Sequence, residues 1–344
     1  MGFYPPGFMP QRRRSIGRVI FSILGVFIIV ASLTANVLVV ATISGCGGGG
    51  KPYAERTIVR GDSARRVAVL PVSGVIMGDT AELFDQFCQG VEEDKSIKAV
   101  IVEVDTPGGS VAASDEILHR LQRLKARRGI PVVVSMAGYA TSGGYYVSAS
   151  ADRIFARPTT ITGNIGVLWP QYDVSELAGK YGVHENLIAA PRPGFKDAGS
   201  MFRPMSTEHR AYFQSLVDAA FAQFKAVVAT GRTGKLKQPI DQIANGKAYT
   251  ADEALKLGLI DQVGYLDDAR QWLVDQGHVA ENAAVVRYKA TRSLLGMLAQ
   301  SRRGGGGDEA AAGSVTVNGV KIELSLKAIE ELRATRPMYL FRAQ

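Results

Sequence analysis

The chain contains 344 residues, of which 46% are hydrophobic and 21% charged, so it can bury a sizeable core and is not globally disordered. Its formal net charge of +8 comes without a basic stripe interleaved with aromatic residues, so nucleic-acid binding is not expected. The two cysteines exclude a disulfide framework and a cysteine-based zinc site, and Cys88 falls in an amphipathic helical pattern that predicts a core position.

The amino-terminal region predicts a membrane anchor. Residues 1–18 form a basic segment that ends in QRRRSIGR, and residues 19–43 carry no charged side chain. Such an apolar stretch spans a bilayer as a helix, and the preceding arginines predict a cytoplasmic amino terminus with the rest of the chain outside. Cys46 follows Ile-Ser-Gly, which resembles a bacterial lipoprotein signal, so cleavage and lipidation at Cys46 are the alternative to an uncleaved anchor. Residues 44–64 are expected to form a glycine-rich linker.

Strands and helices are expected to alternate along residues 65–298, which we predict to form one folded domain. Runs of apolar and β-branched residues predict strands over 65–77, 97–109, 130–138, 152–158, 160–169 and 183–191. Helical spacing of apolar residues predicts helices over 80–96, 111–129, 176–182 and 206–232, a short helix after Ser142, and two more within 246–277. This alternation is typical of an α/β fold with a mostly parallel sheet, in which ligands bind at the carboxyl ends of the strands.

The carboxyl-terminal region has a different composition. Residues 299–313 are predicted to be a low-complexity linker, and the tail over 314–344 has no assigned role. Within the tail, SVTVNGVKIEL alternates around Asn-Gly and predicts a hairpin, and SLKAIEELRATRP predicts a short helix.

Ser142 lies in the glycine-rich turn ATSGG, where it is either part of a tight turn or a nucleophile. An ordinary hydrolytic triad needs a histidine to accept the serine proton. Among the four histidines only His184, near a predicted strand start, could act as that base, and no G-x-S-x-G pattern surrounds Ser142. No cluster of His, Asp and Glu has the spacing of metal ligands, so neither a metal nor a cofactor is expected.

A lysine can replace the histidine if burial or nearby positive charge keeps it neutral. Lys196 lies in the largely apolar stretch GFKDAGSM, although a surface pair with Asp197 is the simpler explanation of the local sequence. The glycines of DTPGG end another strand, so their N–H groups either bind an oxyanion or form a plain turn. A second glycine turn, Ser142-Gly143, follows the next strand, and two such turns on adjacent parallel strands favour a shared site.

Three motifs carry a resemblance to a known family: VDTPGGSV, GYATSGGYYVSASADRIFARPTTITGNIGV and GFKDAGSMFRPMSTEHRAYFQSLVDAAFAQF. In this order, together with GKAYTADEALKLGLIDQVG, they resemble the signal peptide peptidase A family of membrane-anchored serine proteases in its single-domain form. The resemblance covers about residues 65–298. It implies that Ser142 is the nucleophile and Lys196 the general base, and that the N–H groups of Gly109 and Gly143 form the oxyanion hole.

The resemblance also implies a fold, an assembly and a substrate class. The family fold is the Clp protease/crotonase type, a spiral of strand–strand–helix units with a mostly parallel sheet. Members form homo-oligomeric rings in which Ser and Lys of one site can come from neighbouring subunits. The implied activity is endopeptidase cleavage of signal-peptide remnants and other hydrophobic peptides, on the outer side of the bacterial cytoplasmic membrane.

The sequence departs from the family pattern at two positions. Asp105 precedes TPGG where the family often has Asn, which puts a carboxylate near the predicted oxyanion loop and would oppose the oxyanion unless it is turned away or paired. Ala251 stands where Gly is frequent.

Two other functions are compatible with parts of the sequence. One is a catalytically inactive membrane-anchored ring scaffold, which would need neither Ser142 nor Lys196. The other is a crotonase-like enzyme acting on acyl thioesters, which shares the oxyanion loops but not the Ser–Lys pair. Assistance to the dyad from His184 or Asp197 stays open, and one hypothesis for RPMYLF in the tail is that it adds a strand to a neighbouring subunit's peptide groove.

Overall fold

The computed structural model describes residues 25, 27, 29–34, 36, 53–190 and 194–291, and the strands at 313–317, 320–324 and 338–340. The chain divides into two units, Met1–Lys51 and Pro52–Gln344. Residues 1–18, Cys46, the linker over 299–312 and the predicted tail helix lie outside the described residues. Residues 29–34 of the predicted anchor are helical, and none of the helices described is both long and apolar enough to span a membrane.

The second unit contains the strands and helices of the folded domain. The strands are β1 (Tyr53–Val59), β2 (Asp62–Ser73), β3 (Ile97–Thr106), β4 (Gly108–Ser110), β5 (Val132–Thr141), β6 (Arg153–Ala156), β7 (Ile161–Gly163), β8 (Ala248–Thr250), β9 (Gln262–Val263), β10 (Ala283–Ala290), β11 (Gly313–Val317), β12 (Val320–Leu324) and β13 (Met338–Leu340). The helices are α2 (Gly78–Glu93), α3 (Val111–Arg128), α4 (Gly143–Ser148), α5 (Ser175–Lys180), α6 (Thr207–Gly231), α7 (Ile240–Ile243), α8 (Ala251–Leu257) and α9 (Leu266–Asp275), with the 3₁₀ turn η1 (Gly194–Asp197).

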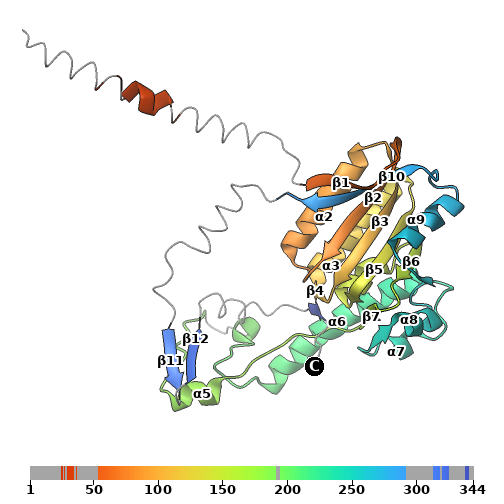
Figure 1. Cartoon of the computed structure of the whole chain (residues 1–344). Coiled ribbons are helices and arrows are strands. Elements are labelled where there is room, and N and C mark those ends of the chain that lie inside the picture. The colour runs from red at the N-terminus through yellow and green to blue at the C-terminus, as the bar shows by residue number, and fades with distance from the viewer. Residues whose placement is uncertain are drawn as a thin grey trace, which may run out of the picture. The chain divides into compact units, whose positions relative to one another are not determined.

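Nine strands form one mixed sheet in the order β1-β10-β2-β3-β5-β6-β9, with β7 paired to β5 and β8 to β7 (Figure 1). Every pairing from β10 through β9 is parallel, as is β5 with β7, whereas β1–β10 and β7–β8 are antiparallel. Parallel strands need helical crossovers, which α2, α3 and α4 provide. The predicted α/β fold with a mostly parallel sheet is confirmed.

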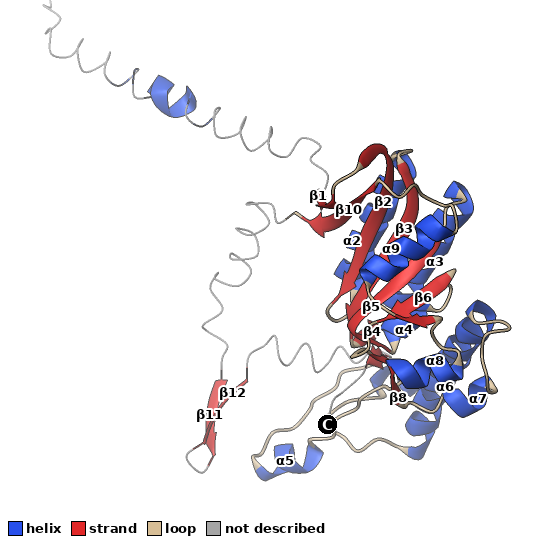
Figure 2. Cartoon of the chain, turned by 45° about the vertical axis from the view of Figure 1, so that its right-hand side comes forward, coloured by secondary structure: helices blue, strands red, loops and turns tan. Residues whose placement is uncertain are grey.

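Hydrophobic residues cover both faces of this sheet because its strands are nearly continuous apolar runs. In β2, Val67 and Val69 pack toward α9, whereas Leu70 and Val72 pack into the larger core under α2 and α3. Figure 1 and Figure 2 show α9 on one side of the sheet and the pair α2 and α3 on the other. The short helix α4 is entirely buried within the larger core.

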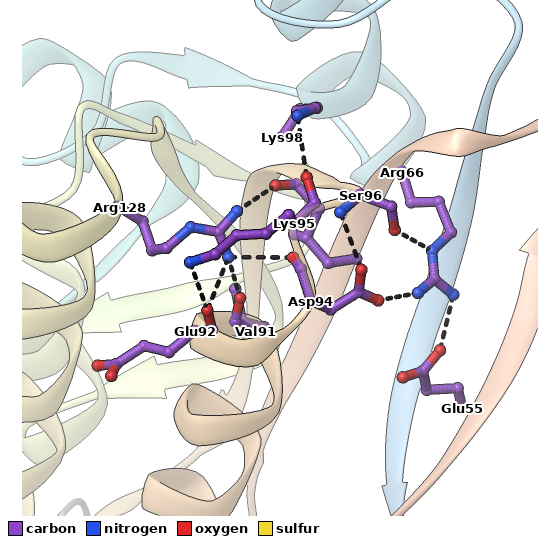
Figure 3. Close-up of polar contacts among 10 residues, drawn as sticks. Glu55, Arg66, Val91, Glu92, Asp94, Lys95, Ser96, Lys98 and Arg128 are labelled. Atoms are coloured by element: carbon purple, nitrogen blue, oxygen red, sulfur yellow. Dashed lines mark hydrogen bonds and ion pairs between the residues drawn. The ribbon is translucent and has the colours of Figure 1, made fainter.

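Two arginines fix the turn between α2 and β3, at the end of the sheet away from the carboxyl ends of its strands (Figure 3). Arg128 donates to the main-chain carbonyls of Asp94, at 3.0 Å, and Ile97, at 2.8 Å, and so joins the end of α2 to the start of β3. Arg66 pairs with Asp94 and, at 2.7 Å, with Glu55 of β1. Burial opposes ionisation of Asp94, but hydrogen bonds from Ser96 and the charge of Arg66 outweigh it and lower the pKa of that carboxyl.

Several predicted elements differ from those in the structure. The strand predicted over 183–191 is wrong: residues 183–190 form no strand, and they are exposed, with Ile188 98% accessible. Tyr53–Val59, assigned to the linker over 44–64, forms β1 because β10 supplies an antiparallel partner. The predicted tail hairpin is confirmed, with β11 and β12 antiparallel and Val317 opposite Val320.

Candidate active site

The DTPGG turn forms a short strand that is held along one edge. Ile76 donates its N–H to the Gly108 carbonyl at 2.8 Å, and Ser110 donates its N–H to the Ile76 carbonyl, also at 2.8 Å. The Thr106 hydroxyl accepts the Gly108 N–H at 3.0 Å. Gly108 has φ of 103°, and a Cβ on Gly109 would lie 2.0 Å from the Ile76 carbonyl oxygen. Both positions therefore require glycine.

Ser142 occupies the turn between β5 and α4 in a conformation rarely adopted by residues other than glycine. Its φ is 55° and its ψ is −114°. Its main-chain N–H donates to the Gly163 carbonyl at 2.8 Å, which ties the turn to the end of β7. The residue is 1% exposed, and its Oγ has no hydrogen-bond partner among the described residues. A buried hydroxyl without a partner is costly, and strained positions of this kind cluster at functional sites.

The two glycine turns meet. A Cβ built on Gly143 would lie 3.3 Å from the Gly109 nitrogen and 2.5 Å from the Oγ of Ser114 on α3. The Ser114 side chain is fully buried, and its Oγ also has no hydrogen-bond partner among the described residues. The structure thus brings Ser142, Gly143 and Gly109 together, with a second buried hydroxyl directly beside them.

The buried helix α4 fixes the position of this turn. The Tyr145 hydroxyl donates to the Leu259 carbonyl at 2.8 Å, and the Tyr146 hydroxyl donates to Asp115 of α3 at 2.6 Å. Burial raises the pKa of Tyr145 above its usual value, so the phenol stays protonated and remains a donor. Both tyrosines anchor the helix that follows Ser142, which leaves the turn little freedom to relax.

Asp105 does not face the predicted oxyanion donors unpaired. Its Oδ1 accepts the main-chain N–H of Tyr139 at 3.1 Å, and its carbonyl accepts the N–H of Gly74 at 3.0 Å. The carboxylate is therefore exposed and hydrogen-bonded to the neighbouring strand β5, although its negative charge is retained. Ala251 is buried as the first residue of α8, behind the Thr250 amino-terminal cap.

Lys196 makes no hydrogen bond with the Ser142 Oγ within the single chain. It is exposed in η1, and Ser142 Oγ has no hydrogen bond to it or to any other described residue. The turn rests on α6 through Phe195, whose ring centroid lies 4.9 Å from that of Tyr212. The structure therefore does not form a Ser142–Lys196 pair within one chain.

The other polar residues of the Lys196 segment form an ion-pair network. Asp197 pairs with Arg203 at 2.8 Å, and Arg203 pairs with Glu185 at 3.1 Å. Ser200 donates to Glu185 at 2.7 Å. The hydrogen bond from Arg203 lowers the pKa of Asp197, so this carboxylate serves the network rather than Ser142. His184 is exposed and, like Lys196, makes no hydrogen bond with the Ser142 Oγ in the described chain.

Three functional candidates were not found from the sequence: Ser114, Ile76 and Arg203. A signal did exist for Ser114, because it shares a helical face with Ile117, Leu118 and Leu121 of the core. A polar residue on an otherwise apolar helical face indicates a buried hydroxyl. Ile76 acts through its main chain, which no side-chain pattern reveals. The described residues hold no group of His, Cys, Asp and Glu arranged to bind a metal ion.

A protein-family profile and individual relatives both match this chain. Residues 125–280 match the profile of peptidase family S49. A predicted signal peptide peptidase SppA of Enterococcus faecium is 35% identical over 254 residues, which are 70% of this chain and 72% of that protein. Protease 4 of Salmonella typhi is 33% identical over 235 residues, 62% of this chain and 37% of its own.

Among solved structures, a 1510-N membrane-bound stomatin-specific protease mutant in complex with a substrate peptide shares 22% identity, at a TM-score of 0.42. The alignment covers 69% of this chain and 97% of that one. The resemblance seen in the sequence motifs is confirmed by the relatives above. The chain belongs to peptidase family S49, among serine peptidases of the signal peptide peptidase SppA type.

Proposed function

We propose that this chain is a serine endopeptidase in which Ser142 is the nucleophile and Lys196 the general base. The observation that carries the proposal is the buried Ser142 Oγ, which has no hydrogen-bond partner in the described part of the chain and sits on a strained turn, next to Gly143 and the glycine strand β4. Neutral Lys196 takes the Oγ proton as Oγ attacks the peptide carbonyl. The resulting lysinium protonates the leaving amine, and water then releases the acyl group from Ser142.

The main-chain N–H groups of Gly109 and Gly143 are the proposed donors to the tetrahedral oxyanion. Their nearness supports this role, because a Cβ on Gly143 would lie only 3.3 Å from the Gly109 nitrogen. Main-chain donors held by a buried helix and a pinned strand need no reorganisation during the reaction. Loss of one such donor typically costs about 10²–10³ in kcat.

Lys196 is proposed to serve the Ser142 of a neighbouring copy in a homo-oligomeric ring. Two observations support this: Lys196 is exposed and makes no hydrogen bond with the Oγ of Ser142 in its own chain, and its segment carries exposed apolar side chains. These are Leu177, Tyr181, Val183, Leu187 and Ile188. Exposed apolar side chains in one short segment are typical of a subunit interface, which would also bury Lys196 and favour its neutral form.

The proposed substrates are cleaved signal peptides and other hydrophobic peptides. The proposed location is the outer side of the bacterial cytoplasmic membrane, with residues 19–43 as the single anchor, or a lipid on Cys46 in its place. The sequence supports this topology through the charge-free stretch that follows the arginine cluster.

The test uses full-length protein in detergent micelles with a hydrophobic signal-like peptide. Ser142→Ala and Lys196→Ala should each lose hydrolysis while retaining the assembly and fold of the wild type. Mixing the two inactive variants as unfolded chains and refolding them together should restore about a quarter of the wild-type activity, because sites combining both intact residues form at random between neighbours. Failure to restore activity would contradict a site shared between subunits.

Other outcomes select the other functions. Hydrolysis by Lys196→Ala but not by Ser142→Ala would point to another base and make His184 the first candidate. A well-assembled but inactive wild type would favour the ring scaffold. Turnover of an acyl thioester that does not depend on Ser142 would favour the crotonase-like enzyme.

A further inference from the structure

The short helix α4 depends on other segments for its position. It contains only six residues, and isolated helices of this length are unstable in water. Its first residue is Gly143, one of the two proposed oxyanion donors, so the contacts that orient α4 also orient that N–H. The Tyr145 hydroxyl ties α4 to Leu259, which follows α8, but this contact does not involve the segment that carries the other donor.

A carboxylate on α3 binds α4 from the side. Asp115 accepts the Tyr146 hydroxyl at 2.6 Å, a length typical of a hydrogen bond to a charged oxygen. Helix α3 has 18 residues and packs into the larger core, so it is the rigid partner in this contact. It begins at Val111, directly after β4, and therefore closely follows Gly109, the other proposed donor. One hydrogen bond thus joins the two helices that follow the two oxyanion donors.

Helix α6 completes this contact. The Gln223 amide donates to the same Oδ1 atom of Asp115, at 3.0 Å, and to the Tyr146 hydroxyl oxygen, at 3.1 Å. The next residue, Phe224, is fully buried, and its ring meets the buried Tyr146 ring edge-on, with centroids 5.2 Å apart. A displacement of Tyr146 would therefore break its hydrogen bond to α3 and disturb its packing on α6.

We propose that Asp115 is a positioning residue that fixes the spacing between the Gly109 and Gly143 N–H groups. This inference rests on the proposed function, which makes these two groups the oxyanion donors. Such donors act because they are already in place before the reaction, so a small shift of one donor relative to the other weakens binding of the tetrahedral state more than binding of the peptide. Asp115 acts on this spacing through Tyr146 and not by contact with the peptide.

The kinetic test compares Asp115→Ala, Asp115→Asn and Tyr146→Phe in the full-length protein. Alanine and phenylalanine each remove one partner of the hydrogen bond, whereas asparagine keeps an oxygen that can accept it. We expect kcat for a hydrophobic peptide to fall about tenfold in Asp115→Ala and in Tyr146→Phe, with KM nearly unchanged and with much of the loss restored in Asp115→Asn. The double variant Asp115→Ala/Tyr146→Phe should be no less active than either single variant, because both changes remove the same contact.

Asp275→Ala is the matched control for these variants. It breaks a hydrogen bond of the same kind, from the Gln271 amide at 3.0 Å, that lies within α9 alone. Its kcat should equal that of wild type. An unchanged kcat in Asp115→Ala, or a loss of the same size in Asp275→Ala, would overturn the inference.

A transition-state analogue distinguishes positioning from a general loss of structure. A peptide boronic acid forms a tetrahedral, negatively charged adduct with the Ser142 Oγ, whereas the matching peptide amide binds without that charge. Asp115→Ala should weaken binding of the boronic acid about tenfold and leave binding of the amide unchanged. Equal weakening of both would mean that Asp115 only supports the fold, and the inference would fail.

Hydrogen exchange gives a readout that does not depend on activity. The segment 143–149 should exchange about tenfold faster in Asp115→Ala than in wild type or in Asp275→Ala. If wild type is inactive but this difference appears, Asp115 still positions α4 and it is the proposed function that fails. If wild type is active and Asp115→Ala changes neither kcat nor exchange, the positioning role fails alone.

Discussion

Ser142 stores strain that a glycine in the same turn would not. Its φ of 55° is unusual for a residue with a Cβ, and the turn is held by the hydrogen bond to Gly163 and by the buried helix α4. A non-glycine residue held in a sparsely populated region costs on the order of 1–3 kcal/mol. Its hydroxyl is buried and has no hydrogen-bond partner among the described residues, so neither the backbone nor the side chain of this serine favours stability.

This strain predicts that Ser142→Gly is more stable than Ser142→Ala. Alanine keeps the Cβ and therefore the strain, whereas glycine has no Cβ and is not strained. The larger conformational entropy of glycine in the unfolded chain offsets only part of the stability gained. The difference in free energy of unfolding should be on the order of 1 kcal/mol in favour of glycine. Urea unfolding of the two inactive proteins measures it, and a less stable glycine variant would show that the turn is not strained.

The close approach of Gly143 to Ser114 predicts a rescue. Gly143→Ala places a Cβ 2.5 Å from Ser114 Oγ, which should shift the turn and lower kcat, since a displacement of 1 Å can cost about 10²-fold. Ser114→Ala removes that oxygen, so the double variant should recover much of the lost activity.

The matched control for this rescue is Gly109→Ala. Its Cβ would meet the Ile76 main chain at 2.0 Å, which no side-chain truncation at position 114 relieves. Peptide hydrolysis by the single and double variants gives the coupling between positions 114 and 143. If the double variant is no more active than Gly143→Ala alone, the contact with Ser114 is not the cause of the lost activity.

At the scale of elements, the Lys196 turn is held by a network that lies outside the cluster around Ser142. Arg203 joins Asp197 and Glu185, and Phe195 packs on α6. Such exposed pairs contribute little to global stability. Their effect should instead be local, on the orientation of η1 and therefore of Lys196.

We expect Arg203→Gln to lower kcat by roughly tenfold or more while leaving KM nearly unchanged, because it loosens the position of the proposed base. Arg210→Gln is the control, since it removes a positive charge from α6 for which the structure describes no ion pair. Steady-state kinetics with circular dichroism checks both proteins. An equal loss of kcat in the two variants would mean that removal of a positive charge, and not the position of η1, lowers the activity.

At the scale of the whole molecule, a buried ion pair joins the end of α6 to the sheet. Arg232 is 1% exposed and binds Asp261 through two hydrogen bonds, of 2.8 and 3.1 Å, while also donating to the Gly258 carbonyl. Asp261 in turn accepts the main-chain N–H of Ile154 in β6 at 2.8 Å. The pair therefore connects three segments that are distant in sequence.

Asp261→Asn should destabilise the fold by about 3–5 kcal/mol, because it leaves the Arg232 charge buried without its partner. Asp241→Asn is the control: it breaks the exposed pair between Lys225 of α6 and Asp241 of α7 and should change the free energy of unfolding by less than about 1 kcal/mol. Urea unfolding of both variants measures the difference. Equal changes in the free energy of unfolding for the two variants would show that Arg232 forms other hydrogen bonds or ion pairs when Asp261 is replaced.

The same pair predicts a dependence on pH. Burial alone would raise the pKa of Asp261, but the hydrogen bonds and charge of Arg232 outweigh it and lower the pKa. A lowered pKa means that the stabilisation is complete above the pKa of unfolded aspartate and is lost as pH falls through the folded value. The stability difference between wild type and Asp261→Asn should therefore shrink below about pH 4, which unfolding curves at several pH values would show.

Much of the architecture follows from local pattern. The β-branched runs of β2, β3 and β5 and the periodic faces of α2, α3 and α6 predict an alternating α/β chain with a mostly parallel sheet, as the structure has it. Pattern failed at 183–190, where apolar residues are exposed on a loop, and at β1, which is a strand because β10 lies beside it. In both cases the outcome depends on whether a distant partner is present.

Local sequence was enough to locate the glycine turns, because Gly108 and Gly109 follow one β-branched run and Ser142 and Gly143 follow the next. The three-dimensional arrangement was needed to show that the two turns meet, that Asp105 accepts a hydrogen bond from Tyr139, and that Lys196 makes no hydrogen bond with the Ser142 Oγ within one chain. It also showed that β13 pairs with β4. Strand pairing and burial join segments far apart in the chain, and no local pattern of residues records which segments will meet.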